Sequence, residues 1–350
     1  MNHKSNHSVC VTLPANGKSL KKILVIRFSS IGDIVLTTPV VRAIKTQVSC
    51  ELNVLTKERF SGIYRNNPHI DRVYSIDSGR DVIPELKAEK FDFIVDLQKN
   101  LRSLKVKKAL GKPNASFPKL NILKWLVVNL KINKLPKLHI VHRYFKAIEV
   151  LNVKNDGKGL DYFIPEKSVV DAIEIDPILS KGYVAIAIGG QHFTKILPVE
   201  KLVEIIPKIK LPVVLLGDGN DWQRGEEIVR QLGKSKVFNA CGKYALDQSA
   251  SIIQQSSAVI SNDTGLMHIA AALQKPTVSI WGNTIPEFGM YPYFPQHSET
   301  SIISEVKNLH CRPCSKLGYR KCPKKHFKCM MLQDEEFISE SINKLVSKAL

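Results

Sequence analysis

The chain has 350 residues, of which 44% are hydrophobic and 24% charged, a composition typical of a globular protein with room for two domains. No apolar run approaches the roughly 18 residues that a membrane-spanning helix needs, which argues against an integral membrane protein. The formal net charge is +19, which favours an anionic partner. The first residues lack the apolar core of a secretory signal, and we expect residues 1–20 to form a disordered tail.

The positive charge is concentrated in two stretches. Thirteen Lys or Arg and no acid lie between Leu97 and Ile148, and eight basic residues and no acid lie between Lys307 and Cys329. Together these exceed the net charge of the chain, so the remainder is slightly acidic. Nucleic acid, a phosphorylated glycolipid and an anionic membrane surface all fit such a charge, and a solvated basic face without a partner is the alternative.

The first predicted unit lies in the segment KKILVIRFSSIGDIVLTTPVVRAIK. Ile23–Ile26 is an apolar run of strand length, and Ser29–Asp33 is a small polar turn. Ile34–Lys45 then places apolar residues at helical spacing, and Pro39 is acceptable there if the helix begins near Leu36. The segment therefore predicts a strand, a turn and a helix.

Strand and helix signals alternate up to about Phe163, which indicates a parallel sheet covered by helices. The expected strands are Ile23–Ile26, Glu51–Leu55, Arg72–Ile76 and Phe91–Asp96. A basic amphipathic stretch follows, whose apolar residues are Leu123, Trp125, Leu126, Val128 and Leu130. This stretch would either touch a membrane surface or pack as an ordinary helix, and we favour the packed helix.

A second alternating set follows a linker near Tyr162–Lys181. Its expected strands are Tyr183–Ile188, Val213–Leu216, Val237–Phe238, Ala258–Ile260 and Thr277–Trp281. An amphipathic helix over Asp334–Leu350 comes last. The sequence therefore predicts an α/β fold with two doubly wound domains.

The most informative stretch is AVISNDTGLMHIAAALQKPTVSIW, Ala258–Trp281. Its polar turn, Ser261–Gly265, lies where a strand ends and a helix begins, which is where parallel-sheet proteins bind ligands. Unpaired backbone N–H groups and the helix dipole there favour an anion such as a pyrophosphate. His268 lies one turn into the helix. A helix cap formed by Asp263 or Thr264 is the alternative interpretation.

Four of the seven cysteines lie in one short stretch: Cys311, Cys314, Cys322 and Cys329. Four thiolates suit a tetrahedral structural zinc ion, although the second half of the cluster lacks a CxxC pair. Reduced, packed thiols are the interpretation that we favour for a cytosolic protein. No catalytic metal is expected.

The segments RFSSIGDIVLTTPVVRAIK and SNDTGLMHIAAALQKPTVSIWG resemble the two signature segments of the heptosyltransferases of glycosyltransferase family 9. KILP at Lys195–Pro198 and the tail CRPCSKLGYRKCPKKHFKCM fit the same pattern. The resemblance extends from Lys21 to the C-terminus, and two long motifs in the right order make it specific. It implies a GT-B fold, in which two Rossmann-like domains face each other across a cleft.

The resemblance also implies a role for each part of the chain. Residues 21–165 would form an acceptor-binding Rossmann-like domain, and residues 180–332, with the cysteine cluster 311–329, a nucleotide-sugar-binding one. Residues 333–350 would form a C-terminal helix that packs back toward the first domain. The implied reaction moves a heptose from ADP-heptose to the inner core of lipopolysaccharide, an acceptor of Kdo or heptose on lipid A. It inverts the anomeric carbon and needs no divalent metal or other cofactor.

Asp33 is the predicted catalytic base, because a carboxylate in this turn would face the cleft and take the proton of the attacking hydroxyl. A helix cap is the alternative role for Asp33. Ser30 and Gly32 are assigned to the acceptor, and Gly32 would let the backbone approach it closely. Lys195 would neutralise charge on the departing diphosphate in place of a metal, and a surface lysine is the alternative there.

The remaining donor contacts come from the second motif. Backbone amides of Thr264, Gly265 and Leu266 are expected to hold the phosphates. Asp263 would bond a sugar hydroxyl. His268 would donate to a phosphate oxygen, and a buried histidine bonded to the backbone is the alternative.

Two further sets of candidates complete the predicted site. Asp221, after LLGDGN, is the candidate for the ribose hydroxyls, and Asp218 competes for that role. Arg102, His142 and Arg143 are the acceptor candidates, because guanidinium groups suit the carboxylates and phosphates of an anionic glycolipid.

Basic residues between Lys99 and Lys146 would steer that glycolipid. The resemblance thus implies a cytoplasmic protein of a Gram-negative bacterium, bound transiently and peripherally to the inner membrane. A nucleic-acid partner is not expected, because no recognition motif accompanies the charge. Three alternatives stay open: a family-9-like transferase that uses another nucleotide sugar, a nucleic-acid-binding protein, and a non-catalytic protein that binds an anionic ligand.

Overall fold

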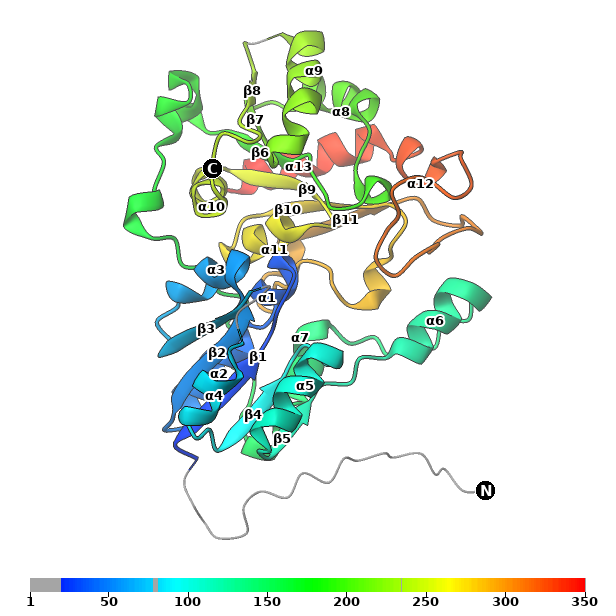
Figure 1. Cartoon of the computed structure of the whole chain (residues 1–350). Coiled ribbons are helices and arrows are strands. Elements are labelled where there is room, and N and C mark those ends of the chain that lie inside the picture. Colours follow the sequence, from blue (N-terminus) through cyan, green and yellow to red (C-terminus); the bar gives the residue numbers. More distant parts are fainter. Residues whose placement is uncertain (1–19, 78–80, 234, 350) are drawn as a thin grey trace. The chain divides into compact units, whose positions relative to one another are not determined.

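The structure is a computed structural model that describes residues 20–77, 81–233 and 235–349 (Figure 1). The tail predicted for residues 1–20 lies outside the described residues except for Leu20. The chain forms two compact units. The first unit consists of the residues up to Ser29, Pro39–Lys119 and Val141–Asp156, and the second unit of Ser30–Thr38, Leu120–Ile140 and Gly157–Leu350. The segment that carries Asp33 therefore belongs to the second unit, whereas the domain boundaries expected from the sequence would place it in the first.

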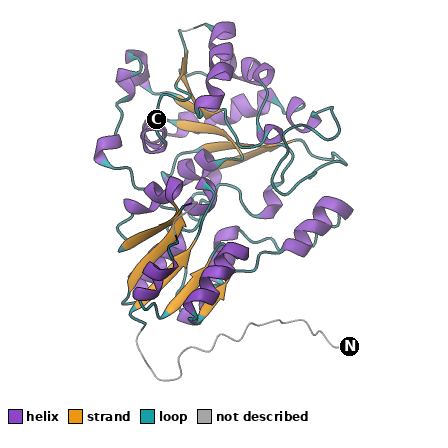
Figure 2. Ribbon diagram, viewed as in Figure 1, coloured by secondary structure: helices purple, strands orange, loops and turns teal. Residues whose placement is uncertain are grey.

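A parallel five-stranded sheet forms the centre of the first unit, in the order β3-β2-β1-β4-β5. Its strands are labelled in Figure 1 and drawn in orange in Figure 2. Its strands are β1 (Lys22–Ile26), β2 (Glu51–Lys57), β3 (Arg72–Ile76), β4 (Phe93–Asp96) and β5 (Asn114–Ser116). The four predicted strands are confirmed. Strands β1, β2 and β4 are largely buried, as in a parallel sheet covered on both faces, whereas the edge strand β3 is mostly half-exposed. The helices of this part of the chain are α2 (Thr38–Gln47), α3 (Ser61–Arg65), α4 (Ile83–Ala88), α5 (Leu101–Leu110) and α7 (Ile140–Phe145).

The helix predicted over Ile34–Lys45 is divided in two, α1 (Ile31–Val35) and α2. Pro39 has no N–H group for the carbonyl of Val35, and its ring would clash with that carbonyl in a continuous helix. The hydroxyl of Thr38 donates to the Val35 carbonyl instead, at 2.7 Å. The break ends α1 after five residues and makes it a separate element.

A parallel six-stranded sheet forms the centre of the second unit, in the order β11-β10-β9-β6-β7-β8. Its strands are β6 (Val184–Ala187), β7 (Val213–Leu216), β8 (Val237–Asn239), β9 (Ala258–Asn262), β10 (Thr277–Trp281) and β11 (Ser301–Glu305). The five predicted strands are confirmed, and β11 is an additional one. The helices of this unit, besides α1, are α6 (Asn121–Leu130), α8 (Val199–Ile205), α9 (Trp222–Leu232), α10 (Leu246–Gln255), α11 (Gly265–Ala272), α12 (Lys328–Met331) and α13 (Glu335–Ala349).

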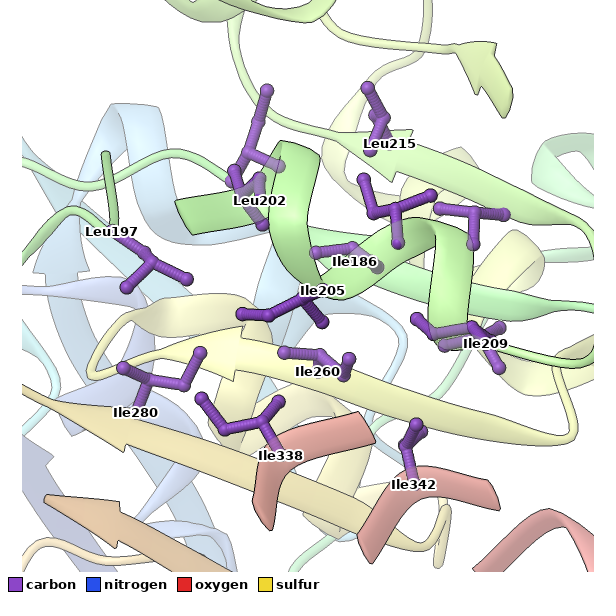
Figure 3. Close-up of a cluster of buried hydrophobic side chains, with 14 of the residues drawn as sticks. Ile186, Leu197, Leu202, Ile205, Ile209, Leu215, Ile260, Ile280, Ile338 and Ile342 are labelled. Atoms are coloured by element: carbon purple, nitrogen blue, oxygen red, sulfur yellow. The ribbon is translucent and has the colours of Figure 1, made fainter. Parts of the chain in front are cut away.

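Alternate strand residues of the second sheet point into one apolar core (Figure 3). Ile186, Leu215 and Ile260 meet there with residues of α8, α9 and α13. Neither α10 nor α11 contributes to this cluster, and α11 packs against β9 and β10 on the opposite face. The sheet is therefore covered on both faces, which leaves its carboxyl-terminal edge as the place for a ligand.

The last helix, α13, uses its apolar face on this second sheet. Ile338 and Ile342 are fully buried in the core of the second unit, beside strands β9 and β10. The sequence also predicted that this helix packs back toward the first domain, which stays a prediction. The amphipathic pattern identified the buried face of α13, but a pattern does not say which sheet that face will meet.

The basic amphipathic stretch forms α6. We favoured a packed helix over one that touches a membrane, and this prediction is wrong for part of α6. Trp125 and Leu130 are 55% and 53% exposed, and Val127 is the buried residue of this helix. Among the described helices, none combines the length and the apolar character that crossing a membrane requires.

Short 3-10 turns connect these elements. They are η1 (Glu58–Phe60), η2 (Glu149–Leu151), η3 (Glu166–Ser168), η4 (Ala172–Glu174), η5 (Pro177–Lys181), η6 (Phe193–Lys195), η7 (Ile206–Lys208), η8 (Gly219–Asp221), η9 (Pro286–Phe288) and η10 (Ser298–Thr300).

We predict that Ile342→Ala will lower the free energy of unfolding by about 2–4 kcal/mol, because it removes buried methyl groups and leaves a cavity. The control is Phe337→Ala, because Phe337 lies on the exposed side of the same helix. This substitution should change the free energy of unfolding by less than about 0.5 kcal/mol. Urea denaturation followed by circular dichroism measures both values. Equal effects of the two substitutions would contradict the placement of α13 on the second sheet.

Candidate functional site

Helices α1 and α11 approach each other at two glycines of the second unit. A Cβ atom on Gly32 would lie 2.4 Å from Cδ2 of His268, and one on Gly265 would lie 2.8 Å from Cγ2 of Ile31. Real Cβ atoms do not come so close to other side chains, so a larger residue at either position would push the helices apart. The contact places Asp33 of α1 next to the first turn of α11.

Asp33 is half-buried, and its neighbour Ser30 holds its carboxylate. The backbone N–H and the hydroxyl of Ser30 both donate to Oδ2 of Asp33, at 3.1 and 2.9 Å. These bonds stabilise the start of α1, so the capping role that we weighed for Asp33 is present. They also fix the orientation of the carboxylate, which a catalytic base requires.

His268 lies one turn into α11 and is 3% exposed. Burial lowers the pKa of its imidazole to about 4, although the charges of Asp263 and Asp33 act in the opposite direction. The side chain is therefore neutral at pH 7. Its Nδ1 atom has no hydrogen-bond partner among the described residues. An unpaired buried nitrogen is costly, so a water molecule or a ligand atom would complete its hydrogen bonding.

Lys195, at the end of η6, is held by Asp263. Its Nζ atom lies 2.6 Å from Oδ2 of Asp263 and donates to the Asp263 carbonyl at 3.3 Å. The hydroxyl of Thr284 donates to the same Oδ2 at 2.8 Å. Lys195 is therefore a fixed cation and not a free surface lysine. The sugar hydroxyl that we predicted for Asp263 would have to share a carboxylate already bound to Lys195 and Thr284.

Asn262, the last residue of β9, connects this strand to the loop that carries Lys195. Its Nδ2 lies 3.3, 3.2 and 3.2 Å from the carbonyl oxygens of Ala187, Ile188 and Gly189, at the end of β6. Its Oδ1 accepts from the backbone N–H of Leu197 at 3.2 Å. The sequence analysis did not identify Asn262 as a candidate site residue, although it lies in the same SNDTG turn as Asp263.

The N-terminus of α11 also lies at the carboxyl-terminal edge of the second sheet, directly after β9. Thr264 is the N-cap residue, but its side chain makes no capping hydrogen bond, and Gly265 and Leu266 are only partly buried. The first N–H groups of a helix have no partner within the helix, and the helix dipole makes them attractive to an anion. The amides of α11, the ammonium of Lys195 and the imidazole of His268 thus provide donors for an anion in one unit.

The first unit has a cationic cluster at the carboxyl ends of its own strands. Lys57 ends β2, Arg59 lies in η1 and Arg102 lies at the start of α5, after β4. Burial lowers the pKa of the Lys57 ammonium, and the charges of Arg59 and Arg102 lower it further. The guanidinium of Arg102 lies 5.9 Å from the ring centroid of Phe28. The sequence identified Arg102 but not Lys57 or Arg59, which lie outside the dense basic stretches.

A family model for glycosyltransferase family 9 (heptosyltransferase) matches residues 80–321, more than half of the chain. The chain belongs to glycosyltransferase family 9. It is therefore a glycosyltransferase enzyme, and the predicted resemblance to this family is confirmed. The match includes the second signature segment, whereas the first segment, residues 27–45, precedes the matched residues.

Individual relatives agree with this assignment. Lipopolysaccharide heptosyltransferase 1 of Campylobacter coli is 26% identical over 292 residues, which cover 75% of this chain and 84% of that protein. The crystal structure of the family 9 glycosyltransferase from Veillonella parvula aligns with a TM-score of 0.74 and 21% identity, over 94% of this chain and 98% of the other. The structure of the Escherichia coli ADP-heptose lipopolysaccharide heptosyltransferase II aligns with a TM-score of 0.66 and 20% identity, over 93% of this chain and 99% of the other. The predicted GT-B class, with two Rossmann-like parallel sheets, is confirmed.

Not every predicted residue of this family 9 enzyme lies at an accessible position. Asp221 is buried with its carboxylate against the backbones of Gly189 and Gly217, where added Cβ atoms would lie 2.1 and 2.7 Å from its side chain. Arg224 donates to its Oδ1 at 2.8 Å. The carboxylate of Asp221 thus has structural partners, and Asp218, which is exposed, is the more accessible of the two ribose candidates.

The two acceptor candidates in α7 differ from each other. His142 is exposed, whereas Arg143 is only 2% exposed, and burial lowers the pKa of each side chain. The acceptor-binding role that we predicted for Arg143 would therefore involve a buried guanidinium, and it stays a prediction. Its helix was recognised as basic, but charge alone does not show which side of a helix is buried.

The cysteines of the C-terminal cluster are free thiols. Burial raises the pKa of the Cys314 thiol and that of the Cys329 thiol, the latter to about 12. The Sγ atom of Cys311 lies 3.8 Å from Nε2 of His326. Within the described ranges, no group of three or more His, Cys, Asp or Glu side chains is arranged to hold a metal ion, so the zinc site considered for this cluster gains no support.

We predict that Gly32→Ala will destabilise the protein by about 1–3 kcal/mol, because the new methyl group would overlap the ring of His268. Gly62→Ala is the matched control, since no atom lies within 4 Å of its Cβ position and alanine favours the helix α3. Chemical denaturation of both variants measures the difference. A Gly32→Ala protein as stable as the control would contradict the close approach of α1 and α11.

The lowered pKa of His268 predicts a loss of stability in acid. As the pH falls from 6.5 toward 4, the imidazole takes up a proton in the unfolded chain but not in the folded one, which removes about 2–3 kcal/mol. The pH dependence should become shallower in His268→Asn. It should be unchanged in His297→Asn, which alters an exposed histidine. Urea denaturation between neutral and acid pH tests this, and identical profiles for all three proteins would contradict it.

Proposed function

We propose that this chain transfers a heptose from ADP-heptose to the inner core of lipopolysaccharide, on an acceptor of Kdo or heptose linked to lipid A. The names of the relatives support the substrate class, because they include lipopolysaccharide heptosyltransferases 1 and 2. Structures of the similar Escherichia coli heptosyltransferase WaaC contain ADP and a fluorinated ADP-heptose. The observation that carries the proposal is the unpartnered, buried Nδ1 of His268 beside Lys195 and the N-terminus of α11.

These groups suit a nucleoside diphosphate. The ammonium of Lys195 is fixed by Asp263, so little conformational freedom is lost when it contacts a phosphate oxygen. The amides of Gly265 and Leu266 begin a helix whose dipole favours negative charge. The neutral imidazole of His268 can donate a hydrogen bond, and an anion beside it would raise its pKa. Together they would stabilise the departing ADP without a divalent metal.

The proposed chemistry is a direct displacement. An acceptor hydroxyl attacks the anomeric carbon of the heptose as the bond from that carbon to the β-phosphate oxygen breaks, and the configuration inverts. The carboxylate of Asp33 takes the hydroxyl proton. Its hydrogen bonds from Ser30 orient it, and the contact of Gly32 with His268 keeps it near the proposed phosphate site.

The proposed acceptor is anionic, and the first unit offers cations for it. Lys57, Arg59 and Arg102 gather at the edge of the sheet where ligands of parallel sheets bind. Arginine side chains suit the carboxylates and phosphates of an inner-core glycolipid. We therefore assign acceptor binding to the first unit and nucleotide-sugar binding to the second. The protein would act on the cytoplasmic face of the inner membrane, and no nucleic-acid partner is proposed.

We predict that Asp33→Asn will bind ADP-heptose within about threefold of the parent but transfer heptose about 10²–10⁴-fold more slowly, because the amide cannot accept the proton. Binding is measured by calorimetry and transfer by ADP release with a Kdo–lipid A acceptor, both with EDTA present. Asp77→Asn, an exposed aspartate outside the site, is the matched control.

The outcomes separate the alternatives. Parental turnover in Asp33→Asn would exclude Asp33 as the base. Tighter binding of UDP-glucose than of ADP-heptose would reassign the donor. Binding of ADP-heptose without transfer by the parent would support a non-catalytic ligand-binding protein.

A further inference from the structure

Helix α6 exposes large apolar side chains. Ile122, Trp125 and Leu130 are 77%, 55% and 53% exposed, and they lie on one side of a helix of ten residues. Single exposed apolar residues are ordinary on protein surfaces, but three on so short a helix form a patch. Such a patch indicates an interaction with an apolar phase or a partner.

The opposite side of α6 is attached to the second unit. Val127 packs in a small cluster with Ile285 and Phe288. The ammonium of Lys124 lies 5.6 Å from the ring centroid of Phe288. Lys131 donates to the carbonyl of Pro313 at 2.6 Å. The helix is therefore held in place by one side, and its apolar patch is presented on the other.

The bond from Lys131 to Pro313 joins α6 to the second basic stretch of the chain. The loop that follows Pro313 and precedes α12 carries exposed apolar residues, Leu317 and Tyr319. It also carries five exposed cations: Lys316, Arg320, Lys321, Lys324 and Lys325. We call α6 and residues 316–325 together the basic apolar surface; α6 is labelled in Figure 1.

The positive charge and the exposed apolar side chains of this surface together indicate which kind of partner it binds. Neither α6 nor residues 316–325 contain an acid, so a second copy of the chain would bring like charges together. A polynucleotide would satisfy the lysines but would leave Ile122 and Leu130 in water. An anionic bilayer meets both needs, because acyl chains accept apolar side chains, lipid headgroups attract lysine and arginine, and tryptophan prefers the interface.

We propose that the basic apolar surface docks the protein on an anionic phospholipid bilayer, with Ile122, Trp125 and Leu130 inserted among the headgroups and acyl chains. The inference deepens the proposed function and rests on it in one respect, since a membrane-anchored acceptor makes such docking useful. None of the three inserted side chains is assigned to the donor or to the base, although the loop contacts the donor side through the hydrogen bond from Tyr319 to Thr194, next to Lys195.

The test is co-sedimentation of the full chain with vesicles, without acceptor or nucleotide sugar. The parent should bind vesicles of phosphatidylglycerol and phosphatidylethanolamine at least tenfold more tightly than vesicles of phosphatidylcholine, and added salt should weaken the binding. The double variant Ile122→Ser/Trp125→Ser should lose at least tenfold in the partition coefficient. The matched control is Val169→Ser/Ile173→Ser, which removes exposed apolar residues (61% and 48%) elsewhere in the same unit and should bind as the parent does.

Equal vesicle binding by the two double variants would overturn the proposal, as would equal binding of the parent to neutral and anionic vesicles. A dimeric parent that becomes monomeric in Ile122→Ser/Trp125→Ser, with no change in vesicle binding, would assign the patch to a second copy and also overturn it. Heptose transfer to a detergent-dispersed acceptor should be unchanged in both double variants. If the parent lacks transfer but shows the vesicle results above, the proposed function fails while the docking surface stands.

Discussion

The close approach of α1 to α11 is the constraint on which the site depends. Gly32 and Gly265 have no side chains, so the two helices meet with the ring of His268 against Gly32. The contact draws a short segment from the beginning of the chain into the second unit, and Asp33 comes with it. The base and the groups proposed to hold the leaving diphosphate are therefore fixed in one compact body.

The electrostatic character of the site follows from burial around His268. Because the imidazole is kept neutral, Lys195 is the fixed cation of the site, and Asp263 balances its charge before any ligand arrives. A diphosphate would bring its own negative charge, and the helix N-terminus, Lys195 and an imidazole with an unpaired nitrogen would all gain a partner at once. The proposed diphosphate would thus supply the hydrogen-bond partner that Nδ1 lacks among the described residues.

The sequence predicted the sheets well because buried parallel strands are continuous apolar runs. It did not predict β5 (Asn114–Ser116), which is short and polar and is added to the sheet by tertiary pairing with β4. It identified the second signature turn but not Thr284, which reaches Asp263 from the loop after β10 only once the sheet has formed. The sequence also did not predict the exposure of Trp125 in α6. The periodicity of this segment indicates an amphipathic helix, but whether Trp125 is packed or exposed depends on which residues lie opposite it in the fold.

The central claim is that the buried nitrogen of His268 belongs to the phosphate site of the nucleotide. The most direct measurement is the ¹⁵N NMR spectrum of the histidine side chains with and without ADP across a pH series, with His268 assigned by its absence in His268→Asn. The account predicts an imidazole that stays neutral down to about pH 4 without ligand, and a Nδ1 resonance and a pKa that both shift when ADP binds. An imidazole that titrates near 6.5, or a His268 signal that ADP leaves unchanged at saturation, would contradict it.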